Sequence, residues 1–192
     1  MVKEIKITRE IIEIAMKKKG YAYFEKGDLN VNIIGIRNSS TGKRVTNQFD
    51  DWMTLSYKVK GEWVFHIWNC TVDNGDGSAR LVEGQYKGSF IIGKHQGKYD
   101  ALKQYKPLKV YRDWNLKDGT YDETKIYDDV AGLNIHMAGV DSTLVNNWSE
   151  GCQVFKRKKD FLSFMKFIFQ AEKIHGKFFT YTLINSKDLE NN

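Results

Sequence analysis

The segment Trp52–Trp68 reads WMTLSYKVKGEWVFHIW and decides the class of fold. Trp52–Val59 and Glu62–Trp68 are rich in aromatic and β-branched residues, which favour strands. The connection between them is Lys60-Gly61, and a two-residue connection that ends in glycine is typical of a β-hairpin. The segment therefore predicts an antiparallel pair of strands in the first half of the chain.

Further strands are expected on both sides of this hairpin, because short apolar runs are separated there by turn residues. They cover Val31–Arg37, Gly88–Gly93, Leu108–Arg112, Gly132–Met137 and Lys177–Ile184.

Two segments with apolar residues at helical spacing predict helices near the ends of the chain. The first covers Arg9–Lys19, with Thr8 as its N-cap and Gly20 at its end. The second begins at Asp160 and closes at Gly176. The whole pattern predicts an α+β fold that is predominantly β, mostly antiparallel, with two flanking helices.

The composition indicates one folded domain. The chain has 192 residues, of which 41% are apolar and 28% are charged, and one domain of this size can bury a substantial core. It contains one proline, Pro107, and no Ser- or Gly-rich linker. We therefore expect a single domain over residues 1–192, with the N-terminal helix at its periphery.

The net charge of +6 fits a polyanionic partner or a generally basic surface equally well. The basic runs lack the aromatic signature of RNA-binding sheets, so no nucleic-acid partner is expected. No apolar run reaches the ~20 residues that span a bilayer, so no integral membrane segment is expected. Met1–Arg9 lacks the apolar core of a signal peptide. We expect a protein that is made in the cytoplasm.

Candidate catalytic residues lie in Leu133–Phe155, which reads LNIHMAGVDSTLVNNWSEGCQVF. His136 ends an expected strand, and a polar loop leads to Cys152. An imidazole can take the proton of a thiol and leave a thiolate nucleophile with an imidazolium beside it. Gly151 lets the backbone approach a bound carbonyl group, and the amides of Gly151 and Cys152 are candidate donors to an oxyanion.

This stretch resembles the signature of the L,D-transpeptidases, which remodel the peptide cross-links of peptidoglycan. The shared pattern is a histidine, a loop of this length and Ser-x-Gly-Cys, here Ser149, Gly151 and Cys152. The resemblance implies a mixed or antiparallel β-sandwich. It also implies that Cys152 forms a thioester with a peptide carbonyl and that His136 acts as base and then acid, with the carbonyl of Met137 orienting the imidazole.

The sequence departs from that family at Glu150 and Val154, where histidine and arginine are common. Asn134-Ile135-His136 together with Trp148–Val154 is more similar to small phage or prophage proteins of this fold. Such proteins are expected to cut wall peptides rather than to cross-link them. We therefore expect a peptidoglycan peptidase of the phage-lysin type, released to the wall by other means, ahead of a transpeptidase, with no cofactor and no metal.

Five residues are candidates for substrate binding. Asn134 could equally well satisfy the end of a strand. Trp148 could form a wall of the groove or belong to the core, which is the commoner place for a tryptophan. His95 lies in a loop flanked by glycines. Tyr86 and Arg112, like Lys94, are candidates to bind a peptide carboxylate. Three other residues are interpreted as structural: Cys70, His66 and His175.

Two rival functions stay open. One is a zinc peptidase with His136, Asp141 and His175 as ligands and Glu172 as base. The other is a non-enzymatic module that binds nucleic acid or a wall polymer through its basic, aromatic surface. The acidic segment Asp113–Asp129 lacks the EF-hand spacing and is interpreted as a solvated hairpin.

Overall fold

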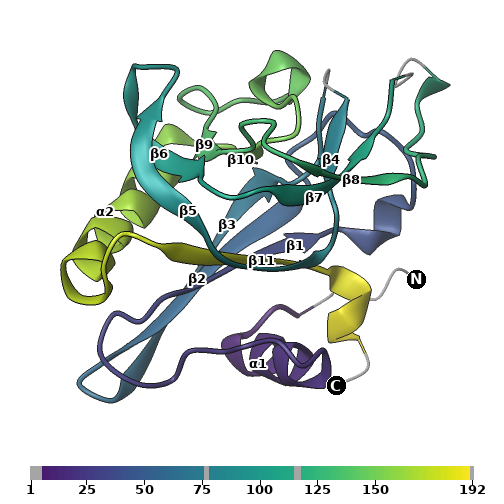
Figure 1. The fold of residues 1–192 in the computed structure, drawn as a ribbon. Helices are drawn as coiled ribbons and strands as arrows, with labels where there is room; N and C mark the ends of the chain where they lie inside the picture. Colours follow the sequence, from purple (N-terminus) through teal and green to yellow (C-terminus); the bar gives the residue numbers. More distant parts are fainter. Residues whose placement is uncertain (1–5, 76–77, 115–117, 191–192) are drawn as a thin grey trace.

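The computed structural model describes residues 6–75, 78–114 and 118–190. Eight strands form a closed barrel, and a smaller sheet of three strands lies beside it (Figure 1). In barrel order the strands are β1 (Asn32–Arg37), β11 (Phe179–Asn185), β5 (Gly84–His95), β6 (Tyr99–Gln104), β9 (Ile135–Met137), β10 (Gln153–Phe155), β3 (Glu62–Thr71) and β2 (Asp51–Val59). The smaller sheet contains β4 (Ala79–Leu81), β7 (Leu108–Arg112) and β8 (Ile126–Asp129).

The expected α+β fold with a predominance of strands and two helices is confirmed, but the sheet closes into a barrel and is not clearly a sandwich. Closure depends on β1, which pairs antiparallel with β2 and parallel with the late strand β11. Each strand of the barrel thereby has two neighbours, which removes the exposed edges of an open sheet.

The predicted hairpin is present as β2 and β3, with Val59 opposite Glu62. Lys60 and Gly61 both have positive φ, at 51° and 86°, as a two-residue turn between twisted strands requires. β3 runs on to Thr71, three residues past the predicted end.

The two helices pack on different parts of the barrel. α1 (Arg9–Lys18) begins after the Thr8 cap and lies on the outer face of β1, with Ile12 and Met16 against Ile34. α2 (Lys158–His175) begins two residues before the expected Asp160, and its apolar face joins the main core. Among the described residues, neither helix is both long and apolar enough to cross a membrane.

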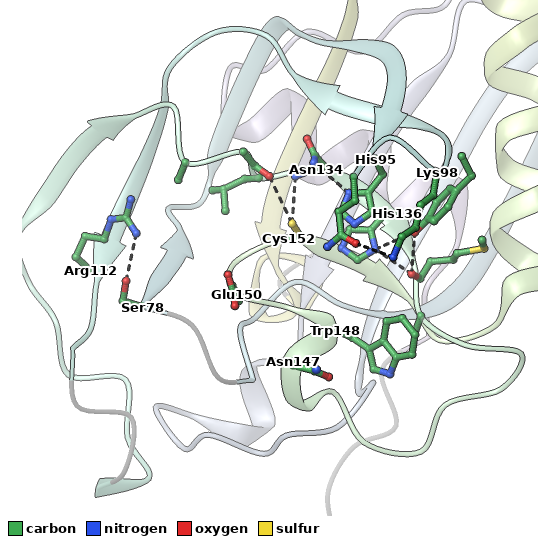
Figure 2. Close-up of a pocket in the computed structure, with 17 residues that line it drawn as sticks. Ser78, His95, Lys98, Arg112, Asn134, His136, Asn147, Trp148, Glu150 and Cys152 are labelled. Atoms are coloured by element: carbon green, nitrogen blue, oxygen red, sulfur yellow. Dashed lines mark hydrogen bonds between the residues drawn. The ribbon is translucent and has the colours of Figure 1, made fainter.

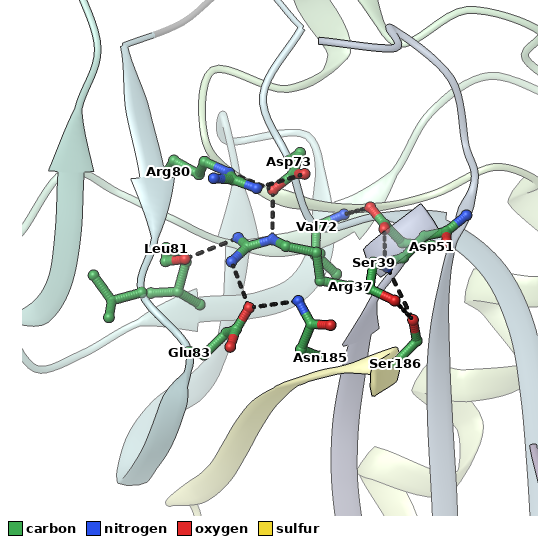
Figure 3. Close-up of polar contacts among 12 residues, drawn as sticks. Arg37, Ser39, Asp51, Val72, Asp73, Arg80, Leu81, Glu83, Asn185 and Ser186 are labelled. Atoms are coloured by element: carbon green, nitrogen blue, oxygen red, sulfur yellow. Dashed lines mark hydrogen bonds and ion pairs between the residues drawn. The ribbon is translucent and has the colours of Figure 1, made fainter. Parts of the chain in front are cut away.

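A buried ionic network joins the smaller sheet to the barrel (Figure 3). Asp73 Oδ1 accepts hydrogen bonds from Arg37 Nε at 2.8 Å and from Arg80 Nε at 3.0 Å. Arg37 lies on β1 and also donates to the carbonyl of Leu81 on β4 at 2.9 Å. Burial opposes the charge of Asp73, yet the two guanidinium groups hold its pKa below the usual range. The network fixes the sheet that forms one wall of the candidate site.

Candidate active site

A pocket of about 670 Å³ opens where β9 and β10 meet the smaller sheet (Figure 2). Seven of the ten residues predicted for the site line it: Cys152, His136, Met137, Asn134, Trp148, His95 and Arg112. Ser149 is fully buried, and Gly151 is buried beside it. Tyr86 is elsewhere.

Parallel pairing of β9 with β10 brings the cysteine and histidine segments together. Gln153 is opposite Ile135 and Val154 is opposite His136, so the residues just before these strands are also neighbours. The amide N–H of Asn134 donates to the sulfur of Cys152 at 3.3 Å. The thiol itself points to the carbonyl of Gly132, with the sulfur 3.6 Å from that oxygen.

The imidazole of His136 is oriented by the backbone. Its Nδ1 lies 2.9 Å from the carbonyl oxygen of Met137, the contact that the resemblance implies. Because a carbonyl only accepts, Nδ1 carries the proton and Nε2 keeps its lone pair. The hydroxyl of Tyr99 donates to the same carbonyl at 3.3 Å. The tautomer is therefore the one in which Nε2 can act as a base.

The loop before the cysteine is held by Ser149. Its hydroxyl donates to the carbonyl of Cys152 at 2.8 Å and accepts from the amide of Gly151 at 3.2 Å. The expectation that the Gly151 amide faces an oxyanion is therefore wrong, since this donor is already used. The amide of Cys152 has no acceptor within the described ranges and stays a candidate oxyanion donor.

Gly151 is required for a steric reason as well. Its φ of 130° is rarely adopted by residues with a side chain. A Cβ atom here would lie 2.6 Å from Leu133 Cδ2 and 2.8 Å from the Cβ of Ala79. Glycine thus lets the cysteine loop pass directly against β4.

The side chains of Cys152 and His136 are both neutral near pH 7. Burial, together with the charge of Glu150, raises the pKa of Cys152 to about 11, although the Asn134 amide favours the thiolate. Burial and the neighbouring His95 lower the pKa of His136 to about 4, against the contact with Met137. The pair thus rests as thiol and imidazole rather than as thiolate and imidazolium.

Of the proposed substrate-binding residues, Trp148 and Arg112 lie at the pocket wall. Trp148 is 42% exposed and belongs to the short helix η3 (Asn146–Trp148), so it is not core. Arg112 donates to Ser78 Oγ at 3.2 Å and forms an ion pair with Asp129. A guanidinium at this position can bind an anionic group of a ligand.

Tyr86 does not reach the pocket, and its predicted role is wrong on geometric grounds. It precedes His95 by nine positions on β5, a separation of about 30 Å along an extended strand. Its hydroxyl instead donates to the carbonyls of Val82 and Lys109. Lys94 also lies outside the pocket, in an exposed ion pair with Asp100.

Sequence reasoning missed Tyr99, which lines the pocket beside His95. A signal was present, because Gln96-Gly97 is a turn dipeptide that folds β6 back along β5. Both residues have positive φ, and the turn leaves Tyr99 directly opposite His95. Other pocket residues missed from the sequence include Ser78, Gln96, Lys98, Gly132 and Asn147.

The ligands of the rival zinc site are not assembled. His175 contacts the carbonyl of Asp28 at 2.8 Å, whereas Asp141 pairs with Arg157. Within the described ranges, the one group of three potential ligand atoms within 4.8 Å is Asp113, Asp122 and Glu123.

The acidic segment is more than a solvated hairpin. Asp113 is 5% exposed and Tyr121 is 4% exposed, while the side chain of Glu123 lies 3.8 Å from Arg80. The segment is therefore partly packed into the domain.

The residues interpreted as structural are placed accordingly. Cys70 is fully buried in the main core, where burial raises its pKa well above the usual value. His66 stacks between Trp68 and Phe167, with ring centroids 5.3 and 4.7 Å away.

The chain matches no model of a known protein family, no curated protein and no solved structure. The resemblance to the L,D-transpeptidases therefore stays a prediction that rests on the residues quoted above. The geometry of the pocket is the remaining source of functional inference.

Proposed function

We propose that the protein is a cysteine-dependent acyl-transfer enzyme that acts on the peptides of peptidoglycan, with hydrolysis favoured over transfer to an amine. One observation carries the proposal: the thiol of Cys152 and the imidazole of His136 line the same pocket, and the histidine has its Nε2 lone pair free. This combination suits nucleophilic attack on a carbonyl group.

In the first half of the proposed reaction, Nε2 of His136 takes the proton of the Cys152 thiol as the sulfur bonds to the peptide carbonyl carbon. The oxygen becomes an oxyanion, for which the amide of Cys152 is the candidate donor. The C–N bond then breaks, the imidazolium returns the proton to the leaving amine, and a thioester remains.

In the second half, water attacks the thioester while His136 again accepts a proton. The C–S bond breaks, the proton returns to the sulfur, and a carboxylic acid leaves. Because both groups start neutral, proton transfer accompanies the attack instead of preceding it. The same histidine therefore serves as base and acid in each half.

One feature supports hydrolysis over the usual transpeptidase reaction. Val154 stands where that family has an arginine tied to the substrate carboxylate, and here the side chain is fully buried with Phe49 and Val145. A substrate carboxylate cannot be bound at that position. The cations that line the pocket are Lys98 and Arg112, and they support anion recognition on other walls.

The test is incubation of the protein with purified peptidoglycan, followed by mass analysis of the fragments. New free carboxyl and amino termini are expected, and they should be absent with Cys152→Ala. New cross-links would instead assign transfer to an amine. Unchanged peptidoglycan in both samples would refute the enzymatic proposal and favour a binding module.

A further inference from the structure

A second histidine is stacked on the candidate base. The rings of His95 and His136 have centroids 4.0 Å apart and planes inclined by 17°. They come from β5 and β9, which are separated in the barrel by β6. Both side chains are buried, at 9% and 3% exposure, and Figure 2 draws them next to each other at the pocket.

Asn134 connects this second histidine to the nucleophile. Its Oδ1 accepts from the amide of Gln104 at 3.1 Å, which fixes the orientation of the side-chain amide. Its Nδ2 therefore donates to Nδ1 of His95, 3.2 Å away. Its backbone N–H donates to the sulfur of Cys152 at 3.3 Å. One residue thus contacts both His95 and the thiol.

These bonds determine the protonation of His95. Nδ1 accepts from Asn134, so it carries no proton and the ring is neutral with its proton on Nε2. Protonation at Nδ1 would break that bond and place a charge against the face of His136. The stack therefore consists of two neutral imidazoles.

We propose that His95 is a positioning residue, whose ring covers one face of His136 and keeps this base neutral and correctly oriented beside Cys152. The inference rests on the proposed function, since it assigns a role within the same reaction. His95 does not contact the reacting carbonyl in this scheme; it acts through His136 and Asn134.

The surrounding charges are consistent with this role. The hydroxyl of Tyr99 faces His136 from β6, and Cys152 lines the same pocket from the loop before β10. Burial first, and then the charges of Lys103 and Lys98, lower the pKa of His95. Glu150 is the carboxylate at the pocket, and it acts on the thiol. The cations near His95 therefore oppose its protonation.

The test distinguishes the contribution of the His95 ring from that of its hydrogen bond with Asn134. His95→Gln keeps an acceptor for Asn134 and removes the ring, whereas His95→Phe keeps a ring and removes the acceptor. NMR titration of the His136 imidazole is the main readout. The pKa of His136 is expected to rise by roughly one unit or more in His95→Gln and by less in His95→Phe. The kcat of His95→Gln should fall roughly 10- to 100-fold.

A purely space-filling role would lower the melting temperature of both variants without moving the pKa of His136. A folded His95→Gln protein whose His136 titrates as in the parent would overturn the inference. If that variant does not fold, His95→Leu fills the same volume without a ring and is judged by the same titration.

Failure of the inference and of the proposed function can be distinguished, because the titration needs no wall substrate. A shifted His136 pKa in a protein whose parent releases no peptide would reject the function and leave the stack's effect intact. Normal cleavage with an unmoved pKa in His95→Gln would reject the role of His95 alone.

Discussion

The hydroxyl of Ser149 donates a 2.8 Å hydrogen bond to the carbonyl oxygen of Cys152 and accepts one from the amide between them, that of Gly151. Ser149 has no exposed surface, so its hydroxyl does not face a ligand. The serine of the Ser-x-Gly-Cys pattern therefore fixes the shape of the loop that carries Cys152.

Ser149→Ala is expected to lower both stability and activity. The substitution leaves the buried amide of Gly151 without an acceptor, which costs about 1–3 kcal/mol of unfolding free energy. Urea denaturation measures this loss. Ser142→Ala is the matched control, because Ser142 Oγ accepts from the amide of Gly139 at 2.9 Å in a contact that is only part-buried. Equal stability losses in the two variants would contradict the assignment.

Cys152→Ala should abolish peptide release while leaving the fold unchanged, because the sulfur is the nucleophile that attacks the peptide carbonyl in the proposed reaction. The expected loss is on the order of 10³-fold or more. Cys70→Ala is the control, because it removes the other cysteine, which lies in the main core. It should lose stability through a small cavity and retain cleavage. Cleavage by folded Cys152→Ala would exclude the thioester route.

Gly151→Ala is expected to destabilise the domain by about 3 kcal/mol or more. The new methyl group meets Leu133 and Ala79, and the backbone is in a conformation unfavourable for alanine. Gly61→Ala is the control, since Gly61 has φ of 86° with open space around its Cβ position. It should cost only about 1–2 kcal/mol. Similar thermal shifts in both would show that the contact with β4 is unimportant.

The sequence predicts local elements of this fold well because their signals are local. The hairpin turn at Lys60-Gly61 and the Thr8 cap of α1 depend on residues next to them, and both are present. The barrel closure depends on the pairing of β1 with β11, about 150 residues later along the chain. No periodicity within either strand specifies that partner, so the closure could not be predicted, and the resemblance implied a sandwich instead.

The candidate site shows the same difference between local features and features that depend on distant strands. The hydrogen bond from His136 to Met137 joins adjacent residues, and the resemblance to the L,D-transpeptidases implied it. The stack of His95 on His136 joins residues from two strands that are not neighbours, and its existence follows only from the barrel. Tyr86 was misplaced because the length of β5 could not be read from GSFIIG alone.

The neutral resting pair predicts a specific pH dependence. The pKa of His136 is about 4, so the base stays available above that pH and activity is lost as the pH falls through it. The pKa of Cys152 is about 11, so alkylation by iodoacetamide should be slow at pH 7 and rise about tenfold per pH unit towards 11. The measurement uses Cys70→Ala, so that only Cys152 reacts. Rapid alkylation at pH 6 would instead indicate a preformed thiolate.

The same shift of His136 links stability to pH. Its folded pKa lies below the usual 6.5, so the unfolded chain binds more protons between these values. The corresponding stability is present above pH 6.5 and is lost as the pH falls towards 4. His136→Gln should show a shallower loss of unfolding free energy over that window in urea titrations. An unchanged slope would mean that the imidazole is not buried as described.

Arg112→Gln is expected to weaken substrate binding more than catalysis. The guanidinium is at the pocket wall but is not among the groups that exchange protons, so KM should rise while kcat changes little. Loss of a charged hydrogen bond to an anionic ligand corresponds to roughly a 10- to 100-fold rise. Lys94→Gln removes a cation whose ion pair with Asp100 lies outside the pocket, and it should leave KM unchanged. The measurement is steady-state cleavage of soluble wall peptides by both variants. Because the two changes remove the same charge, an equal rise in KM would show a general effect of the basic surface and would contradict a specific role for Arg112.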